Sequence, residues 1–203
     1  MGVILLGAGG HCKQVIDIFT ENNVEIIGIY DDEKTGVWYG VQILGTIKEL
    51  NYRNIINHKL FCCIGDNEVR RNLLYRFIDY TWINCIAKKA RISKSVKMGV
   101  GNYIGGLAQI LSDSLLGDGN IINEGVVITH DISIGHFNHI APGTVICGNC
   151  RIGDLNLLGA GSIVLPKTTI KDNNIFGSGA VINRNLDSDA TYVGVPVRKL
   201  VKE

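Results

Sequence analysis

From Ile86 to Ile182, every sixth residue is aliphatic, Met or Phe, and the register continues unbroken through 17 hexads. A period of six fits neither an α-helix, with about 3.6 residues per turn, nor a plain strand, which alternates about every 2 residues. It is typical of a parallel β-helix, in which three short strands form one coil and each strand directs one apolar side chain inward. The apolar positions are Ile86, Ile92, Met98, Ile104, Ile110, Leu116, Ile122, Ile128, Ile134, Ile140, Ile146, Ile152, Leu158, Val164, Ile170, Phe176 and Ile182.

The repeat also predicts which residues stack on one another. Three hexads make one coil, so residues eighteen positions apart lie one strand spacing apart, about 4.8 Å. Ile122, Ile140, Leu158 and Phe176 then form one inward column. The spacing of the apolar residues does not indicate the handedness of the coil. Connections between parallel strands are right-handed by default.

The first 84 residues follow a different pattern. Short apolar runs alternate there with amphipathic stretches, which predicts βαβ order and a small parallel sheet with helices on its faces. The expected strands cover residues 3–6, 25–30 and 60–64, and the expected helices cover 12–22 and 68–79. We therefore expect two domains, an α/β domain at 1–84 and an all-β solenoid with a C-terminal tail at 85–203.

Three polar loops follow the expected strands of the first domain. They are Gly9-Gly10-His11, Asp31-Asp32 and Gly65-Asp66-Asn67. Ligands of such sheets bind beyond the carboxyl ends of the strands. The turn begins like a dinucleotide fingerprint, but Cys12 stands at the third glycine position and the sheet is short, which argues against NAD.

Glycines at a helix start let backbone N–H groups approach a phosphate, and Asp31 is suited to accept hydrogen bonds from a ribose or sugar hydroxyl. A phosphate-bearing small molecule such as a nucleotide sugar is the favoured ligand. The alternative is that the loops are only tight turns with a solvated acidic pair.

Composition narrows the classes of function. The chain has 203 residues, 46% hydrophobic content and a net charge of +1, which gives no bias towards nucleic acid or acidic membranes. No apolar run approaches the roughly 18 residues that span a bilayer, so we expect a cytoplasmic protein with reduced thiols. Cys147 and Cys150 fall at small-residue positions of the hexads, and without a second such pair we expect no metal site.

The histidines carry the candidate chemistry of the solenoid. His130, His136 and His139 lie within ten residues, and none occupies an inward position. A solvated histidine is the alternative for each. For His130, the adjacent Asp131 favours a functional reading, because a carboxylate orients an imidazole and increases its basicity. Such a base suits an amine or hydroxyl nucleophile.

Several motifs together resemble the PglD/NeuD-type sugar O/N-acyltransferases. They are the Gly-Ala-Gly-Gly-His turn, the Tyr-Asp-Asp strand end, the Ile-Gly-Asp-Asn loop, Val-Ile-Thr-His130-Asp131, Gly-His-Phe-Asn-His139-Ile-Ala-Pro-Gly143 and the closing Gly194-Val-Pro-Val-Arg-Lys. The resemblance covers essentially the whole chain. It implies a left-handed β-helix and an acyltransferase that uses acetyl-CoA.

The resemblance also implies roles for individual residues. His130 matches the general base and Asp131 its carboxylate partner, while His139 matches a histidine that faces acetyl-CoA. Ala160 and Ser178 match backbone contacts to the pantetheine arm, and with Pro142 they form one column at intervals of eighteen. The positions matched to nucleotide-sugar contacts are Gly9, Gly10, His11, Asp31, Asp32 and Gly65. Asn123 either touches the sugar or belongs to a side-chain ladder of the repeat.

We therefore expect direct transfer of an acetyl group to a nucleotide-linked amino sugar, most simply a 4-amino-4,6-dideoxyhexose destined for a surface glycan. Alternatives are O-acetylation of a sugar such as sialic acid and a non-catalytic nucleotide-sugar-binding protein. A γ-type carbonic anhydrase with zinc on His130, His136 and His139 leaves the first domain without a purpose.

We also expect a homotrimer, because the flat flanks of a three-sided solenoid pack around a threefold axis. His130 and His139 are one and a half hexads apart. They therefore lie on different stretches of one coil, and we expect them to meet across a subunit interface.

Overall fold

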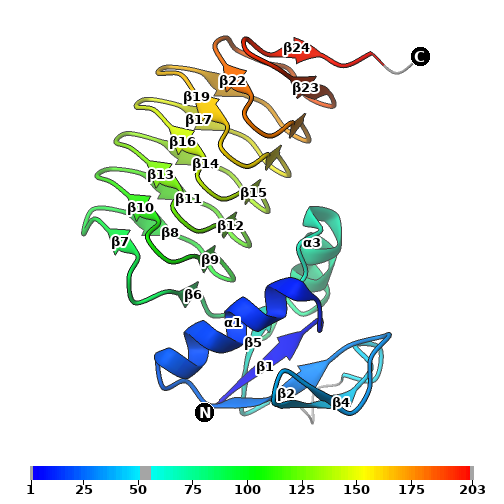
Figure 1. The fold of residues 1–203 in the computed structure, drawn as a ribbon. Helices are drawn as coiled ribbons and strands as arrows, with labels where there is room; N and C mark the ends of the chain where they lie inside the picture. The colour runs from blue at the N-terminus through cyan, green and yellow to red at the C-terminus, as the bar shows by residue number, and fades with distance from the viewer. Residues whose placement is uncertain (1, 51–55, 202–203) are drawn as a thin grey trace.

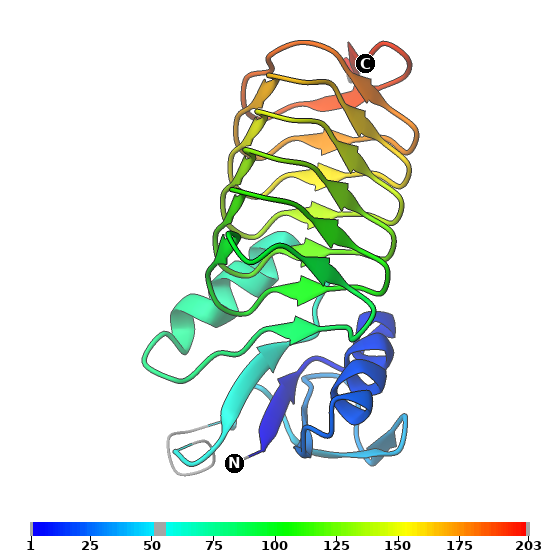
Figure 2. The ribbon, with the colours of Figure 1, turned by 90° about the vertical axis from the view of Figure 1, so that its left-hand side faces the viewer.

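A computed structural model describes residues 2–50 and 56–201 of the chain. An α/β segment sits at one end of a long solenoid whose coils rise away from it towards the C-terminus (Figure 1). The side view shows the flat sheets of the solenoid and the regular stacking of its coils (Figure 2). Within the described residues, no helix has the length and apolar character to cross a membrane.

The N-terminal sheet has the strand order β3-β4-β2-β1-β5. Its strands are β1 (Val3–Leu6), β2 (Ile26–Tyr30), β3 (Val37–Trp38), β4 (Val41–Gly45) and β5 (Lys59–Cys62). The predicted parallel order is confirmed for β2, β1 and β5. β3 and β4 were not predicted; β4 pairs parallel with β2, but β3 runs antiparallel to β4. The sheet is therefore mixed. Tyr39 and Gly40 link β3 to β4 with φ of 48° and 79°, as a two-residue hairpin turn requires.

Among residues 2–50 and 56–201, two helices flank this sheet. They are α1 (Gly10–Glu21) and α3 (Asn67–Arg76). The Asp66 side chain caps α3 by accepting a hydrogen bond from the Val69 N–H at 2.9 Å. Gly9 precedes α1 without a side-chain cap, and the first turn of α1 contains no acidic residue. The first N–H groups of α1 are therefore left without a side-chain acceptor of their own.

The solenoid confirms the hexad prediction strand by strand, because each two-residue strand ends on a predicted apolar position. The strands are β6 (Cys85–Ile86), β7 (Arg91–Ile92), β8 (Lys97–Met98), β9 (Tyr103–Ile104), β10 (Gln109–Ile110), β11 (Leu115–Leu116), β12 (Ile121–Ile122), β13 (Val127–Ile128), β14 (Ser133–Ile134), β15 (His139–Ile140), β16 (Val145–Ile146), β17 (Arg151–Ile152), β18 (Leu157–Leu158), β19 (Ile163–Val164), β20 (Thr169–Ile170), β21 (Ile175–Phe176) and β22 (Val181–Ile182).

The coils stack in the predicted register. Ile122 pairs with Ile140, Ile140 with Leu158, and Leu158 with Phe176, each eighteen residues further on. Three parallel sheets result, in the orders β22-β19-β16-β13-β10-β7, β20-β17-β14-β11-β8 and β21-β18-β15-β12-β9-β6. The inward columns form one continuous apolar core. The last sheet continues into β23 (Thr191–Val193) and β24 (Arg198–Lys199), which form an antiparallel pair, and Tyr192 stacks on Phe176.

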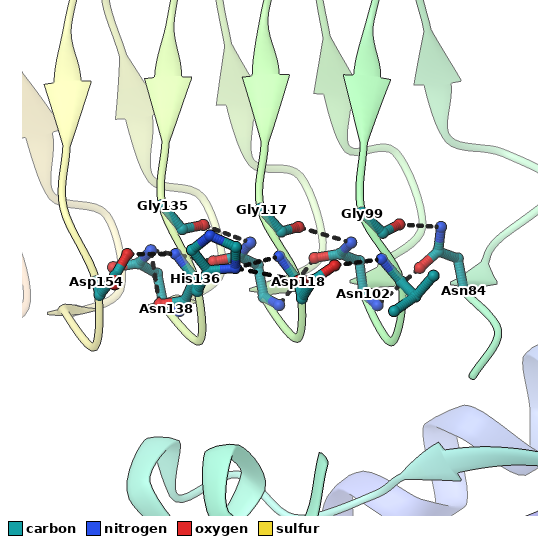
Figure 3. A network of polar contacts seen from close by, with 11 residues as sticks. Asn84, Gly99, Asn102, Gly117, Asp118, Gly135, His136, Asn138 and Asp154 are labelled. Atoms are coloured by element: carbon teal, nitrogen blue, oxygen red, sulfur yellow. Dashed lines mark hydrogen bonds and ion pairs between the residues drawn. The ribbon is translucent and has the colours of Figure 1, made fainter. Parts of the chain in front are cut away.

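A column of asparagines runs through the solenoid (Figure 3). The Asn120 Oδ1 accepts a hydrogen bond from the Asn138 backbone N–H at 2.9 Å, and the Asn138 Oδ1 accepts one from the Asn156 N–H at 2.9 Å. The Asn138 Nδ2 donates to the Gly153 carbonyl at 2.9 Å. The full column is Asn84, Asn102, Asn120, Asn138, Asn156 and Asn174. Because its inner members are buried, the column satisfies backbone groups that water does not reach.

The α/β segment packs on the sheet that begins with β6. Apolar residues of α1 share a core with Cys85, Tyr103 and Ile121 on the outer face of that sheet. On the other side, residues of α3 pack with Trp82 and Phe137. This docking brings the loop after β1 next to Tyr103 on β9, and the loop after β5 next to His139 on β15.

We predict that Asn138→Ala lowers the free energy of unfolding by about 2 to 4 kcal/mol, because it leaves the buried Asn156 N–H and the partly buried Gly153 carbonyl without these partners. Chemical denaturation at fixed protein concentration measures this change. Asn183→Ala, at an exposed position of the same solenoid, is the matched control, with an expected change below about 0.5 kcal/mol. Equal losses in the two variants would contradict the role of the column.

Candidate functional site

A cavity of about 520 Å³ opens at the carboxyl ends of β1, β2 and β5. Its lining brings together the three loops singled out in the sequence, including Gly9, Gly10, His11, Asp31, Asp32 and Gly65. The N-terminus of α1 borders the cavity, so its backbone N–H groups and the positive end of its dipole favour an anionic group there.

Asp31 binds the loops of this cavity to one another. Its Oδ2 accepts a hydrogen bond from the Ala8 N–H at 2.6 Å, and its Oδ1 accepts from Glu33 and Lys34 at 3.0 and 2.8 Å. Burial alone would raise the pKa of Asp31, but these backbone donors and the Lys34 ammonium hold it below its ordinary value. Asp31 is thus an anionic brace, whereas Asp32 beside it is exposed at the cavity wall.

The Lys34 ammonium also lies at this wall. It donates to the Ala8 carbonyl and lies 3.7 Å from the centre of the Trp38 ring. Both contacts hold a positive charge beside the glycine turn, where it complements an anionic ligand.

His11 lines the cavity, and its ring extends towards the solenoid. Its ring packs edge-on against Tyr103 with ring centres 4.5 Å apart, and the Tyr103 hydroxyl donates to the Glu124 Oε1 at 2.6 Å. Burial lowers the pKa of His11 to about 4, and the hydrogen bond to Gln14 opposes this only in part. The His11 Nε2 is buried and finds no hydrogen-bond partner among the described residues. A neutral ring with one unused nitrogen therefore lies between the cavity and the solenoid.

His139 lies beside this group on β15. Its Nδ1 is 3.3 Å from the Gly65 carbonyl oxygen, and its Nε2 is 3.0 Å from the Asn123 Nδ2. Burial, followed by the positive charge of Arg70, lowers the pKa of His139. His139 and Asn123 are thus joined directly to a loop of the cavity.

His130 and Asp131 lie elsewhere, at the corner between β13 and β14. The His130 Nδ1 is 2.7 Å from the Asp131 Oδ2, and their side chains are 60% and 54% exposed. Because a carboxylate only accepts, Nδ1 carries the proton and the lone pair of Nε2 is directed away from Asp131. Asp131 has φ of 58°, a left-handed conformation that Asp tolerates well. The ring lies over Gly148, where an added Cβ would be 2.8 Å from the His130 Nε2.

Ala160 and Ser178 lie on a third part of the surface, the corner that follows β18 and β21. The Gly179 N–H donates to the Ala160 carbonyl at 2.8 Å, as the Gly161 N–H donates to Pro142 at 2.9 Å. The backbone N–H groups of Ala160 and Ser178 donate no hydrogen bond within residues 2–50 and 56–201, and both residues are exposed. They form a ladder of unused donors that suits the amide carbonyls of an extended chain.

One chain therefore brings some predicted site residues together and leaves others apart. The cavity residues lie beside His139 and Asn123, while His130 with Asp131 and the ladder of Ala160 with Ser178 lie at two other corners. His136 pairs with Asp118, so the three clustered histidines do not converge. Across the described part of the chain, no group of three or more histidine, cysteine or acidic residues is placed to hold a metal ion.

Sequence reasoning missed Arg70, Tyr103 and Glu124. Tyr103 stands immediately before an inward position and Glu124 two residues after one, so the hexad pattern assigns both to the outer surface. Arg70 falls within the helix expected over residues 68–79, where nothing in the pattern distinguishes it from an ordinary surface charge, yet it is 1% exposed. No signal in the sequence singles out these three residues. The asparagine column was also missed, although Asn recurs at every eighteenth residue from Asn84 to Asn174.

Comparisons with known proteins agree with this geometry. Residues 2–77 match the family model described as the PglD N-terminal domain. A histidine-to-alanine variant of GDP-perosamine N-acetyltransferase from Caulobacter crescentus, solved with CoA and GDP-perosamine, superposes with a TM-score of 0.96 at 32% identity, covering 100% of this chain and 98% of that one. The acetyltransferase domain of PglB from Neisseria gonorrhoeae gives 0.92 at 28% identity, covering 98% and 99%.

An uncharacterized protein of Acanthamoeba polyphaga mimivirus is 49% identical over 113 residues, which are 55% of this chain but only 23% of the viral protein. The perosamine enzyme, by contrast, matches over essentially its full length and includes both the α/β segment and the solenoid. The chain therefore belongs to the PglD/NeuD-type sugar O/N-acyltransferases, the family with a left-handed β-helix that its sequence resembles.

Proposed function

We propose that this acyltransferase moves the acetyl group of acetyl-CoA to the amino nitrogen of a nucleotide-linked amino sugar, a 4-amino-4,6-dideoxyhexose used for a surface glycan. The observation that carries the proposal is the whole-chain match to an enzyme whose structure holds CoA and GDP-perosamine. The PglB acetyltransferase domain, solved with acetyl coenzyme A, supports the same cosubstrate.

The nucleotide sugar occupies the cavity beside α1. Its phosphates face the N–H groups of Gly10 and His11 at the helix start, where Lys34 adds positive charge. Asp31 is committed to three backbone donors, so exposed Asp32 is the better acceptor for a ribose hydroxyl. The sugar then extends past Gly65 towards Asn123 and His139, the polar side chains that adjoin the cavity.

Acetyl-CoA lies along the corner of Pro142, Ala160 and Ser178. The unused N–H groups of Ala160 and Ser178 meet the amide carbonyls of the pantetheine arm, and His139 faces the acyl end. This ladder adjoins the sheet that carries His139, so both contributions come from the same chain.

His130 is the general base. The attacking nitrogen forms a bond to the thioester carbonyl carbon, the His130 Nε2 takes the proton of that nitrogen, and the C–S bond then breaks to release CoA. Asp131 holds the ring with its Nδ1 proton and stabilises the imidazolium that forms. Backbone N–H groups stabilise the tetrahedral oxyanion.

The active site is completed by a second copy of the chain in a homotrimer. Within one chain, His130 lies at the corner that follows β13, whereas His139 lies on the face of the sheet that contains β15. Packing of two solenoids flank to flank brings His130 of one copy to the ladder and His139 of the next.

We predict that the protein releases the CoA thiol from acetyl-CoA in the presence of one or more members of a panel of UDP-, dTDP- and GDP-linked 4-amino sugars. Matched sugars with a hydroxyl group in place of the amine test O-acetylation. Turnover confined to hydroxy sugars would replace the proposal by O-acetylation. Binding of a nucleotide sugar without any turnover would favour a non-catalytic binding protein.

We predict that His130→Ala lowers kcat by about 10²- to 10⁴-fold, roughly 3 to 5 kcal/mol of transition-state stabilisation, with the fold intact. Asp131→Asn lowers kcat less, because Asn suits the same left-handed conformation but provides no charge. Asp113→Asn is its control, since Asp113 occupies the equivalent corner one coil earlier with φ of 60°. Near-full turnover of the His130 variant would remove this residue from the mechanism.

Gly148→Ala is predicted to lower kcat by about 10- to 100-fold without loss of stability, because the added methyl group displaces the exposed His130 ring. Steady-state kinetics of the double variant with His130→Ala provide the control. If Gly148 acts through His130, the second change has no further effect in that background. If the losses in kcat of the two single variants add up in the double variant, Gly148→Ala does not act through His130.

Mixed assembly tests the shared site. His130→Ala and His139→Ala subunits, each inactive alone, are denatured together and reassembled, and each variant reassembled alone is the control. We predict recovery of a fraction of wild-type activity in mixed trimers. A monomer by light scattering, or verified mixed trimers without recovery, would contradict the shared site.

A further inference from the structure

Arg70 is a buried cation that joins the cavity to the solenoid. It lies on α3 and is 1% exposed. The Nη1 donates to the carbonyls of Ile64, Gly65 and Asp66 at 3.1, 3.0 and 3.3 Å. The Nε donates to Gly119 at 2.6 Å, and the Nη2 contacts the oxygens of Asn67, Phe137 and Asn138 at 2.7, 3.1 and 3.3 Å.

These contacts use the charge of Arg70 in an unusual way. None of the ion pairs found among the described residues includes Arg70, and its acceptors are six backbone carbonyls and one amide oxygen. Burial lowers the pKa of Arg70 to about 10, so the guanidinium remains charged at neutral pH. A buried charge without a carboxylate is costly unless all its donors are satisfied. The planar guanidinium satisfies its donors with carbonyls of the loop after β5 and of two neighbouring coils, and so connects that loop to the solenoid.

The Gly65 carbonyl is shared by Arg70 and His139, at 3.0 and 3.3 Å. A carbonyl oxygen only accepts, so the His139 Nδ1 carries a hydrogen. On the other side, the Asn123 Nδ2 also donates, so the His139 Nε2 must present its lone pair. A protonated ring would place two donors against each other there. The geometry therefore allows the neutral Nδ1–H tautomer and orients the amide of Asn123.

We propose that Arg70 is a positioning residue that holds the Gly65 carbonyl against His139 and thereby fixes His139 in its neutral Nδ1–H tautomer. Asn123 then keeps its Nδ2 on the ring and turns its Oδ1 away as an acceptor for the substrate. Because Gly65 also lines the cavity, occupation of the cavity and orientation of His139 depend on the same carbonyl. The consequence for catalysis rests on the proposed function, but the tautomer does not.

The first test needs no variant of Arg70. Protein labelled with ¹⁵N in its histidines is examined at pH 7 by two-bond ¹H–¹⁵N correlation, without acetyl-CoA or sugar, and the His139 signals are assigned by their loss in His139→Asn. We expect a protonated Nδ1 and an unprotonated Nε2. An Nε2–H tautomer or a cationic ring would overturn the proposal, even if acetyl transfer is observed.

Arg70→Lys tests the cause. Lysine keeps the charge but loses the fork, so we expect His139 to populate the Nε2–H tautomer and kcat/KM for the nucleotide sugar to fall about 10- to 100-fold. Arg71→Lys is the matched control, because Arg71 follows on the same helix and pairs only with Glu68 among the ion pairs described. An unchanged His139 spectrum in folded Arg70→Lys would overturn the proposal. Loss of acetyl transfer in every protein, with the expected spectra, would count against the proposed function instead.

Arg70→Met separates charge from geometry. The groups that bear on His139 are Arg70, whose charge lowers the pKa of His139, the Gly65 carbonyl, which raises it, and the neighbouring His11 ring, which itself lies near Glu124. Removal of the Arg70 charge in a folded variant moves the titration midpoint of His139 upward, whereas Arg70→Lys leaves it low. A midpoint that stays at the wild-type value in Arg70→Met would show that Arg70 does not act on His139.

Discussion

Each coil of the solenoid is hydrogen-bonded to the coil above and the coil below at one strand spacing, so every backbone position meets its own equivalent eighteen residues later. A side chain is acceptable only if it packs well against a neighbour in the same conformation. Aliphatic residues meet this condition inside. Asparagine meets it in the column from Asn84 to Asn174, because its amide supplies both an acceptor and a donor to adjacent coils.

The same constraint decides what could be predicted from the sequence. The hexads predict every strand from β6 to β22, since an inward position cannot tolerate a polar group. The asparagine column has an equally regular period, but Asn is common in loops and its burial is not evident from residue type. The hairpin of β3 and β4 depends on two residues with positive φ, one of them Tyr39, which is an uncommon residue for that conformation.

The candidate site divides along similar lines. The three loops of the cavity were predictable because strand order alone places them at one edge of the sheet. Arg70 was not predictable, because its acceptors at Gly119, Phe137 and Asn138 lie 49 to 68 residues further along the chain. In the sequence it is one of several charged residues on a polar helix. Only the docking of α3 on the solenoid turns it into an interior residue.

The coil length also limits how proteins of this architecture gain or lose residues. Removal of eighteen residues between His139 and Ser178 would lower everything beyond it by one rung, about 4.8 Å, and keep each corner above its old place. Removal of six residues would instead rotate the upper coils by a third of a turn and carry the donor ladder of Ala160 and Ser178 to another corner. Deletions inside the solenoid therefore preserve the spatial order of the cavity, His139 and the ladder only when they remove whole coils of eighteen residues. Insertions that are not multiples of eighteen residues preserve this order only when they form loops that protrude from a corner.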